Sequence, residues 1–322
     1  MKNGLISLVA IAALSANMAH GQAEADTTHH TVQFVTVDKD VKLEVLDWGG
    51  EGRPLVFLSG LGSTAHVYDQ FAPQFTAKYH VYGITRRGWG DSSKPAPSVA
   101  NYAADRLGDD VLAVIDTLKL NRPVLVGHSI AGEELSSIGN RHPEKVAGLI
   151  YLDAADAYGY YDQAHGDWFL DMLELRKEID ALQAGAVIDQ QYIQEMLANA
   201  ALLEKDTEAL SKRMALMPGP VPPPPPPVGV ATRFGEQKYT QIHGPVLAIF
   251  ACPHNFDFIR DSGAKAALIA NDLVTCTAQA NAFEAGVPTS HVVRLPNADH
   301  YIFRSNAAGV ARAMNSFLAA LP

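Results

Sequence analysis

Residues 123–132 read PVLVGHSIAG. An apolar run, Val124–Val126, precedes a group of small residues that surround Ser129. This pattern is typical of a nucleophile elbow, in which a serine sits on a sharp turn between a strand and a helix so that its Oγ is exposed. Ala131 stands where the second glycine usually lies, and Gly132 follows at once. The stretch predicts that Ser129 is a nucleophile on an α/β fold.

The chain around this stretch alternates short apolar runs with amphipathic segments. Alternating apolar residues in His30–Val37 and Val41–Asp47 predict an N-terminal hairpin, and spacings of three and four in Asn101–Leu120 predict a helix. The apolar runs expected to form covered central strands are Leu55–Ser59, His80–Ile84, Val124–Val126, Val146–Leu152, Val246–Phe250 and His291–Leu295. We therefore predict an α/β fold with an eight-stranded, mostly parallel sheet flanked by helices.

The alternation of strand and helix patterns is interrupted between residues 157 and 241. Glu174–Leu210 has a helical pattern, and Pro218–Val228 reads PGPVPPPPPPV. Proline lacks the N–H and fixes φ, so we expect this run to be extended polyproline II. The strand pattern resumes at Pro245. We interpret residues 157–241 as an inserted lid in one core that comprises residues 24–156 and 242–322.

The first 23 residues have the layout of a signal peptide. Lys2 is followed by an apolar stretch, Leu5–Ala16, and small residues precede a cleavage site after Ala23. The stretch is short for a spanning helix, which needs roughly 20 apolar residues. We expect a periplasmic or secreted enzyme, in which Cys252 and Cys276 could oxidise. The sequence leaves open whether they are bonded.

Composition excludes several classes of protein. Of the 322 residues 48% are hydrophobic, which is enough for a sizeable core, and the formal charge of −10 argues against nucleic acid or an anionic membrane as partner. Two cysteines are too few for a four-cysteine zinc site. No P-loop or GxGxxG occurs. We expect a small-molecule substrate, no cofactor and no metal; the oligomeric state stays open.

Taken together, these motifs resemble the α/β-hydrolase superfamily, and in particular its lidded, esterase-like members with a serine nucleophile. The resemblance covers about residues 30–320 apart from the insertion. It rests on four motifs in the family's order: LSGLGS at Leu58–Ser63, RGWGDS at Arg87–Ser92, GHSIAG at Gly127–Gly132, and NADH at Asn297–His300. It implies an oxyanion hole formed by the backbone N–H groups of Leu61 and Ile130.

His300 is the expected base, because it lies on the loop after the last strand and fits the order Ser…Asp…His that this fold uses. The acid has two candidates. The family's usual place after Val246–Phe250 reads ACPH, which puts His254 where an aspartate is expected and leaves Asp257 three residues later. The other place is the end of the preceding strand, where Asp153 stands. We favour Asp153 and keep Asp257 as the alternative.

The serine limits the chemistry. Dehalogenases and epoxide hydrolases form an alkyl ester with a carboxylate and need aspartate at the position of Ser129. A serine triad fits hydrolysis of a carboxylic ester through an acyl-enzyme, which is our expectation. The same triad would also suit C–C bond, lactone or amide hydrolysis. A ligand receptor that keeps the triad without turnover is the alternative from another class.

Overall fold

The computed structural model describes residues 29–216 and 224–322. The expected signal peptide, residues 1–23, and residues 218–223 of the proline-rich run lie outside these residues. None of the helices within the described ranges combines the length and the apolar character needed to cross a membrane.

The eight strands form one sheet in the order β1-β2-β4-β3-β5-β6-β7-β8. β2 pairs antiparallel with both β1 and β4, and the other neighbours are parallel. The strands are β1 Thr31–Asp38, β2 Val41–Gly49, β3 Pro54–Leu58, β4 His80–Ile84, β5 Val124–His128, β6 Gly148–Leu152, β7 Val246–Ala251 and β8 Ser290–Leu295. The predicted sheet is confirmed.

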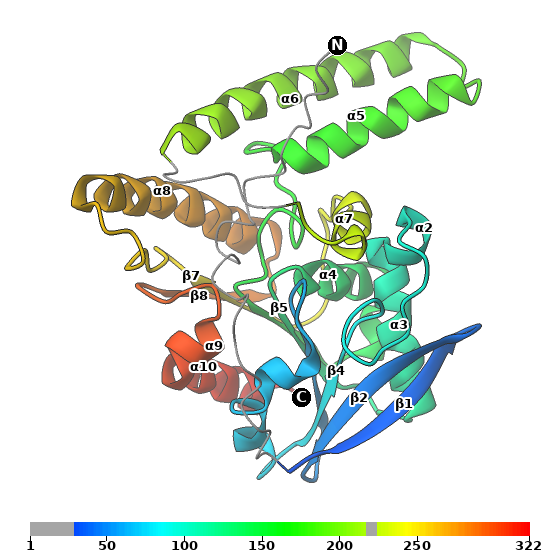
Figure 1. The fold of residues 1–322 in the computed structure, drawn as a ribbon, viewed down its shortest axis with the longest axis vertical. Coiled ribbons are helices and arrows are strands. Elements are labelled where there is room, and N and C mark those ends of the chain that lie inside the picture. Colours follow the sequence, from blue (N-terminus) through cyan, green and yellow to red (C-terminus); the bar gives the residue numbers. More distant parts are fainter. Residues whose placement is uncertain (1–28, 217–223) are drawn as a thin grey trace.

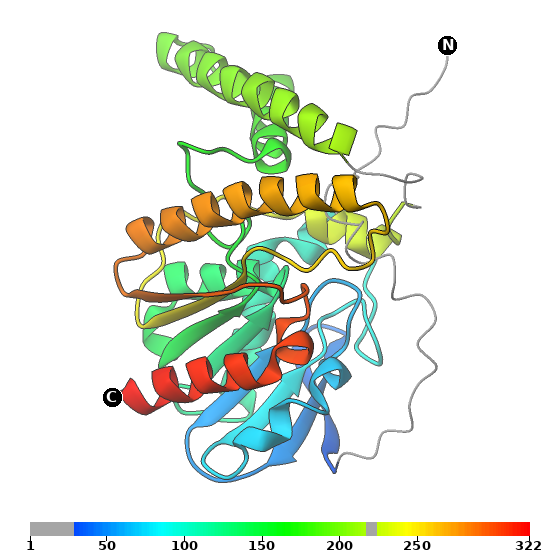
Figure 2. The ribbon, with the colours of Figure 1, turned by 90° about the vertical axis from the view of Figure 1, so that its left-hand side faces the viewer.

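Helices cover both faces of the sheet (Figures 1 and 2). Their bounds are α2 Val99–Tyr102, α3 Ala104–Thr117, α4 Ala131–Arg141, α8 Ser262–Gly286, α9 Ile302–Ser305 and α10 Ala307–Ala320, with short 3-10 turns η2 Ala65–Tyr68, η3 Ala72–Phe75 and η4 Pro143–Lys145. The helix expected over Asn101–Leu120 is therefore α3, with α2 as a separate turn before it.

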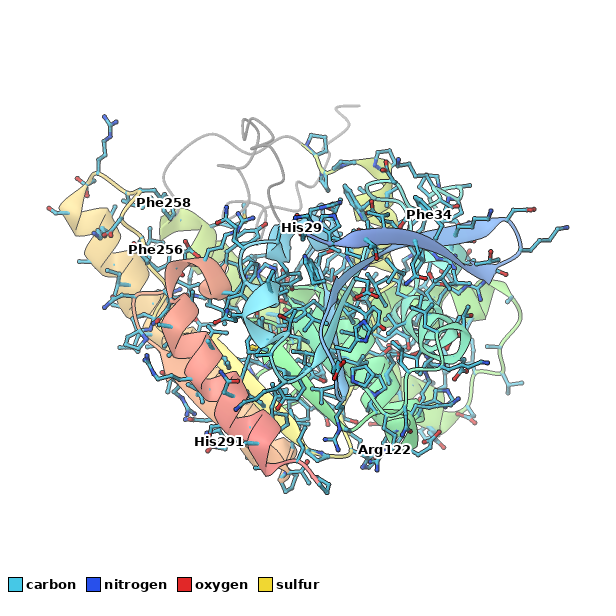
Figure 3. The ribbon with its side chains drawn as sticks, turned by 90° about the horizontal axis from the view of Figure 1, so that it is seen from below. His29, Phe34, Arg122, Phe256, Phe258 and His291 are labelled. Carbon is cyan, nitrogen blue, oxygen red and sulfur yellow. A yellow bond between two sulfur atoms is a disulfide. The ribbon has the colours of Figure 1, made fainter. Side chains whose placement is uncertain are left out.

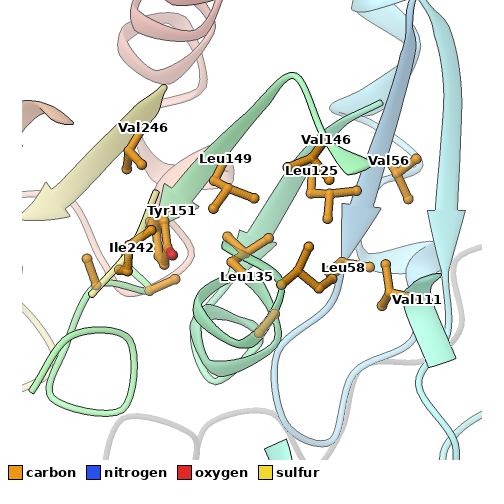
Figure 4. Packing of buried hydrophobic residues seen from close by; sticks show 14 of the residues in the cluster. Val56, Leu58, Val111, Leu125, Leu135, Val146, Leu149, Tyr151, Ile242 and Val246 are labelled. Atoms are coloured by element: carbon orange, nitrogen blue, oxygen red, sulfur yellow. The ribbon is translucent and has the colours of Figure 1, made fainter. Parts of the chain in front are cut away.

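The two faces use alternate residues of the same strands, because neighbouring side chains in a strand point to opposite sides. On one face Leu125 and Leu149 pack with Leu135 of α4 in a cluster that also includes residues of α3 and α8 (Figure 4). On the other face Val126 and Ile150 join residues of η2, η3, α9 and α10. The covered parallel strands fix their carboxyl ends at one edge of the sheet.

The segment between β6 and β7 contains α5 (Trp168–Gln183), α6 (Gln190–Leu216) and α7 (Pro227–Phe234). The helical character expected over Glu174–Leu210 is confirmed, and it is divided between two helices, α5 and α6, which form a hairpin above α8 in Figure 1. Gly185, at φ +90°, follows the end of α5, and glycine is favoured in this left-handed conformation after a helix. Asp189 then accepts the N–H of Tyr192 at the start of α6 (2.8 Å).

The prediction that the whole proline run is extended is wrong at the C-terminal end of the run. Pro226 has polyproline-like angles (φ −53°, ψ 152°), but α7 begins at Pro227. Proline is tolerated in the first turn of a helix, because its missing N–H would have no partner inside the helix.

Candidate active site

Ser129 lies between β5 and α4, at the carboxyl edge of the sheet. Its φ of +55° is left-handed, as a sharp strand-to-helix turn requires. The turn packs tightly on the end of β6: the N–H of Ser129 donates to the carbonyl of Leu152 (3.3 Å). A Cβ on Gly132 would lie 1.8 Å from the carbonyl oxygen of Ala154. The glycine is thus required one residue later than usual, and Ala131 is accommodated in the motif.

The structure brings Ser129, His300 and Asp153 together. Nε2 of His300 lies 2.8 Å from Oγ of Ser129, and Nδ1 of the same ring lies 2.7 Å from Oδ2 of Asp153. These residues come from the carboxyl ends of β5, β6 and β8, the edge where sites in parallel sheets form. The two ring nitrogens face opposite partners, which is the geometry needed for a base that is held by a carboxylate.

Asp153 is held rigidly at the end of β6. Its backbone has a φ of +47°, its N–H donates to the carbonyl of Ile249 (2.7 Å), and its Oδ1 accepts the N–H of Ala251 (2.9 Å). Only 5% of the residue is exposed. Asp257 instead lies on the surface, where it accepts hydrogen bonds from Lys265 and Asn255. The structure therefore puts Asp153, and not the alternative Asp257, against His300.

A second histidine also contacts Asp153. Nε2 of His254 lies 2.9 Å from Oδ2, and its Nδ1 lies 3.1 Å from Oδ2 of Asp272 on α8. Burial opposes a charge on His254, but the charges and hydrogen bonds of Asp153 and Asp272 raise its pKa to about 11. Burial likewise opposes ionisation of Asp153, yet His254, and then the hydrogen bond to His300, hold the pKa of that carboxyl well below its usual value.

The loops that carry the two histidines run side by side. His254 and Ala298 form a parallel bridge, and the N–H of Asn297 donates to the carbonyl of Pro253 (2.9 Å). These bonds extend the pairing of β7 and β8 into the loops. Cys252, at the start of the first loop, forms a disulfide with Cys276 of α8, with Cα atoms 5.6 Å apart. The bonding that the sequence left open is thus present.

The loop after β3 lies against the nucleophile. A Cβ on Gly60 would lie 3.1 Å from Cβ of Ser129 and 2.9 Å from Nδ1 of His128, so only glycine allows this approach. Within the described residues, the N–H groups of Leu61 and Ile130 donate no hydrogen bond to protein. Both are available to a substrate oxygen beside Ser129, as the sequence predicts for an oxyanion hole.

Buried ion pairs hold this edge together. Arg86 forms a bidentate pair with Glu134 of α4 (both 2.7 Å) and donates to the carbonyl of Ser59 (3.1 Å). It thereby connects the end of β3 to the helix that begins at the nucleophile. Arg87, fully buried, pairs with Asp110 of α3. Such fork-shaped pairs fix geometry as well as supply energy.

His128, the residue before Ser129, contacts the backbone of His300. Burial and the neighbouring His300 lower its pKa to about 3, so the ring is neutral. Its Nε2 lies 2.8 Å from the carbonyl oxygen of His300 and donates to it. Sequence patterns could not predict this contact, because it spans 172 residues.

Aromatic side chains after β6 serve two purposes. Tyr161 and Phe169 pack with Leu170 in a small buried cluster. Tyr158 is buried; its hydroxyl donates to Asp156 (3.4 Å) and lies near Ser129. Tyr158 thus lies beside Ser129, whereas Tyr161 and Phe169 pack in the cluster with Leu170.

A cluster with metal-ligand chemistry lies away from Ser129. His30, His66 and Asp69 each direct a ligand-type atom to within 4.8 Å of the others. Hydrogen bonds to Asp69 and to Glu44 raise the pKa of His66 to about 10. Glu44 also accepts from Thr85 (2.6 Å). Histidine and carboxylate together could ligate a transition metal, but these ion pairs account for the arrangement of His66.

Comparison with known families places the chain. The model of a family described as the alpha/beta hydrolase family matches residues 55–313. A fluoroacetate dehalogenase from Burkholderia sp. is 33% identical over 117 residues, which are 36% of this chain and 38% of that protein. A 3-oxoadipate enol-lactonase from Acinetobacter baylyi is 32% identical over 122 residues, 38% of this chain and 45% of that protein. Each match thus spans less than half of the relative.

Solved structures share the fold at low identity. An E-2-(acetamidomethylene)succinate hydrolase superposes with a TM-score of 0.56 and 19% identity, over 91% of this chain and 100% of the other. Est816, described as an N-acyl homoserine lactone degrading enzyme, gives 0.53 and 22%, over 88% and 100%. At these identities the likeness supports the fold.

Proposed function

The chain belongs to the alpha/beta hydrolase family, and we propose that within it the protein is a serine hydrolase that cleaves carboxylic esters through an acyl-enzyme on Ser129. One observation carries the proposal: a single ring, His300, lies between the hydroxyl of Ser129 (2.8 Å) and the carboxylate of Asp153 (2.7 Å). The hydrolase class follows from the family; the preference for esters is our inference.

In the proposed reaction, Oγ of Ser129 attacks the ester carbonyl while Nε2 of His300 takes its proton. The N–H groups of Leu61 and Ile130 bind the oxygen that becomes negative, each contributing about 10²–10³ in rate. His300 then protonates the leaving alcohol. In the second half a water molecule attacks the acyl-enzyme, again with His300 as base, and the acid and Ser129 are released.

The nucleophile argues against dehalogenation, although a dehalogenase is among the relatives. An alkyl-enzyme ester needs a carboxylate at position 129, where this chain has serine. A second candidate is a cyclic ester as substrate, because one relative is an enol-lactonase and one structural neighbour degrades N-acyl homoserine lactones. Lactone hydrolysis uses the same acyl-enzyme. C–C bond and amide hydrolysis remain alternatives without a specific supporting observation.

We propose that the segment 157–241 acts as a lid over this site. Two observations support it: the buried Tyr158 lies near Ser129, and a Cβ on Gly229 of α7 would lie 3.8 Å from the side chain of Leu61. α7 thus lies over the loop that carries the proposed oxyanion donor. The lid would set which acyl or alcohol groups enter.

The test is an activity screen with a matched control. Purified protein is assayed with p-nitrophenyl acetate, butyrate and palmitate, an aryl ester, γ-butyrolactone and an N-acyl homoserine lactone, beside Ser129→Ala. We expect turnover of at least one ester or lactone, and none by the variant. Turnover of lactones alone would favour the second candidate. A correctly folded wild type that turns over none of them would leave the receptor alternative.

We further propose that the enzyme is exported, with cleavage of residues 1–23. The proposal rests on the apolar stretch Leu5–Ala16 and is supported by the Cys252–Cys276 disulfide, which suits an oxidising compartment. Mass spectrometry of the protein from the periplasm or medium of an expressing bacterium should give a mature chain that begins at Glu24. A full-length chain confined to the cytosol would contradict it.

A further inference from the structure

We propose that His254 and Asp272 form a positioning pair that holds Asp153 in the orientation in which it accepts Nδ1–H of His300. The inference rests on the proposed function, because it assigns a role in support of the same base. It extends the three-residue arrangement to a continuous line of five side chains: Ser129, His300, Asp153, His254 and Asp272.

The hydrogen bonds define the protonation of His254. Its Nε2 faces Oδ2 of Asp153 (2.9 Å), and its Nδ1 faces both oxygens of Asp272 (3.1 and 3.2 Å). Ionised carboxylates only accept hydrogen bonds, so both ring nitrogens of His254 carry a proton. A pKa of about 11 for His254 agrees with this assignment. One imidazolium therefore lies between two carboxylates.

Hydrogen bonds to both oxygens limit the rotation of the Asp153 carboxylate. Oδ1 accepts the N–H of Ala251 (2.9 Å), and Oδ2 accepts from both His254 and His300. Without His254, Oδ2 of Asp153 would keep His300 as its only side-chain partner within the described residues. The imidazolium thus fixes the oxygen that must stay in line with Nδ1 of His300.

The fold anchors the pair on two sides. Asp272 lies on α8, and it also accepts the backbone N–H of His254 (2.7 Å). The disulfide joins Cys252, two residues before His254, to Cys276, one helical turn after Asp272. Figures 1 and 2 show α8 running alongside β7 and β8, and Figure 3 marks the loop after β7 by Phe256. The carboxylate of Asp272 therefore cannot move away from His254 without distorting that loop.

The positive charge has an effect of its own on the base. His254 and His300 share one oxygen of Asp153, so the cation opposes protonation of His300. Among the described residues, the ring of His300 contacts Ser129, Asp153, His128 and Tyr301. The ring of His254 contacts Asp153 and Asp272. Arg304 stacks on Tyr301, and Tyr158, which donates to Asp156, lies near Ser129. Removing the cation should move the midpoint of the kcat–pH profile to higher pH, because the protonated base becomes more favourable.

The experiment separates the charge from the hydrogen bond. His254→Ala removes both, whereas His254→Gln keeps an N–H that can reach Oδ2 of Asp153 and removes only the charge. Asp272→Asn removes the outer anion. The matched control is His291→Gln, an exposed histidine on β8 that Figure 3 labels. Each variant is assayed with p-nitrophenyl acetate between pH 5 and 10, with thermal unfolding measured in parallel.

We expect His254→Ala to lower kcat by about 10–100-fold with KM nearly unchanged, as for a small misplacement of a reacting group. His254→Gln should recover most of that loss, yet both variants should shift the profile midpoint upward. His291→Gln should behave as wild type. Wild-type kcat and midpoint in both His254 variants would overturn the proposal. So would a loss of kcat that follows the loss of thermal stability while the midpoint stays in place.

A second measurement does not depend on turnover, so it also decides the case if no ester is cleaved. Histidine is labelled with ¹⁵N, and the His254 signals are assigned by their absence from His254→Gln. At pH 8 we expect both ring nitrogens of His254 to be protonated, and the Nδ1–H signal of His300 to be displaced in His254→Gln and Asp272→Asn. A neutral His254 at pH 8, or an unchanged His300 signal, would overturn the pair even in an active enzyme.

Discussion

Oδ2 of Asp153 accepts the Nδ1–H of His300 at 2.7 Å across 147 residues of sequence, whereas Asp257, much nearer to His300 along the chain, does not contact that ring. The contact depends on the sheet. β6 and β8 end at the same edge with β7 between them, so the residue after β6 can reach the loop after β8.

Asp153→Asn should leave the protein folded and lower kcat by roughly 10³–10⁴, because the amide favours the wrong tautomer of His300. Asp257→Asn should cost little, since that side chain pairs with Lys265 on the surface. Steady-state kinetics on one ester measure both variants. Comparable losses in the two, or a larger loss for Asp257→Asn, would contradict the assignment of the acid.

Gly60→Ala should lower kcat by about 10²–10³, the cost of misplacing one oxyanion donor. The added Cβ would lie 2.9 Å from His128 and 3.1 Å from Ser129, so the loop has to move away from the nucleophile. Gly263→Ala, where the nearest atom is an oxygen of Asp261 at 3.4 Å, is the matched control and should be nearly silent. Wild-type kcat in Gly60→Ala would contradict the assignment of an oxyanion donor to this loop.

The stability that His254 provides should fall as the pH rises. Its pKa is raised from 6.5 to about 11 in the folded protein, so between these values the folded state binds more protons than the unfolded state. This contribution is complete below about pH 6.5 and is lost as the pH approaches 11. Denaturant unfolding of wild type and His254→Gln should show the largest difference near neutral pH and convergence at alkaline pH. A constant difference would refute a charged His254.

Replacing both Cys252 and Cys276 with serine should lower the free energy of unfolding by about 3 kcal/mol, the usual effect of a disulfide that closes a loop of this length. Because Cys252 stands two residues before His254, kcat should fall as well under conditions where the variant is fully folded. Denaturant unfolding and ester kinetics test the two parts. Unchanged stability would mean that the bond is absent from the protein in solution.

Much of the fold and of the candidate site could be predicted from the sequence, because the patterns that indicate them are local. The elbow around Ser129 is a short motif, the strands are compact apolar runs, and the order of nucleophile, acid and base follows from them. Asp153 could be favoured by position alone, but the choice over Asp257 required coordinates. The stretch ACPH at residues 251–254 indicated only that His254 stands where an aspartate is expected.

Features that depend on packing between distant elements could not be predicted. Asp272 is one of many polar residues along α8, and only the approach of that helix to the loop after β7 brings it to His254. His128 likewise gains its partner from a loop 172 residues away. The boundary between α5 and α6 near Gly185 could not be predicted, because the residues on both sides have a helical pattern.

The proposed mechanism requires Ser129 to be an activated nucleophile, and active-site labelling measures this property. The protein is treated with a serine-reactive fluorophosphonate and digested, and the modified peptide is identified by mass spectrometry. We expect one label, on Ser129, that blocks ester hydrolysis. The label should be absent from Ser129→Ala and should form far more slowly in His300→Ala and Asp153→Asn. A folded wild type that takes no label, or takes it at another residue while Ser129→Ala keeps its turnover, would contradict the claim.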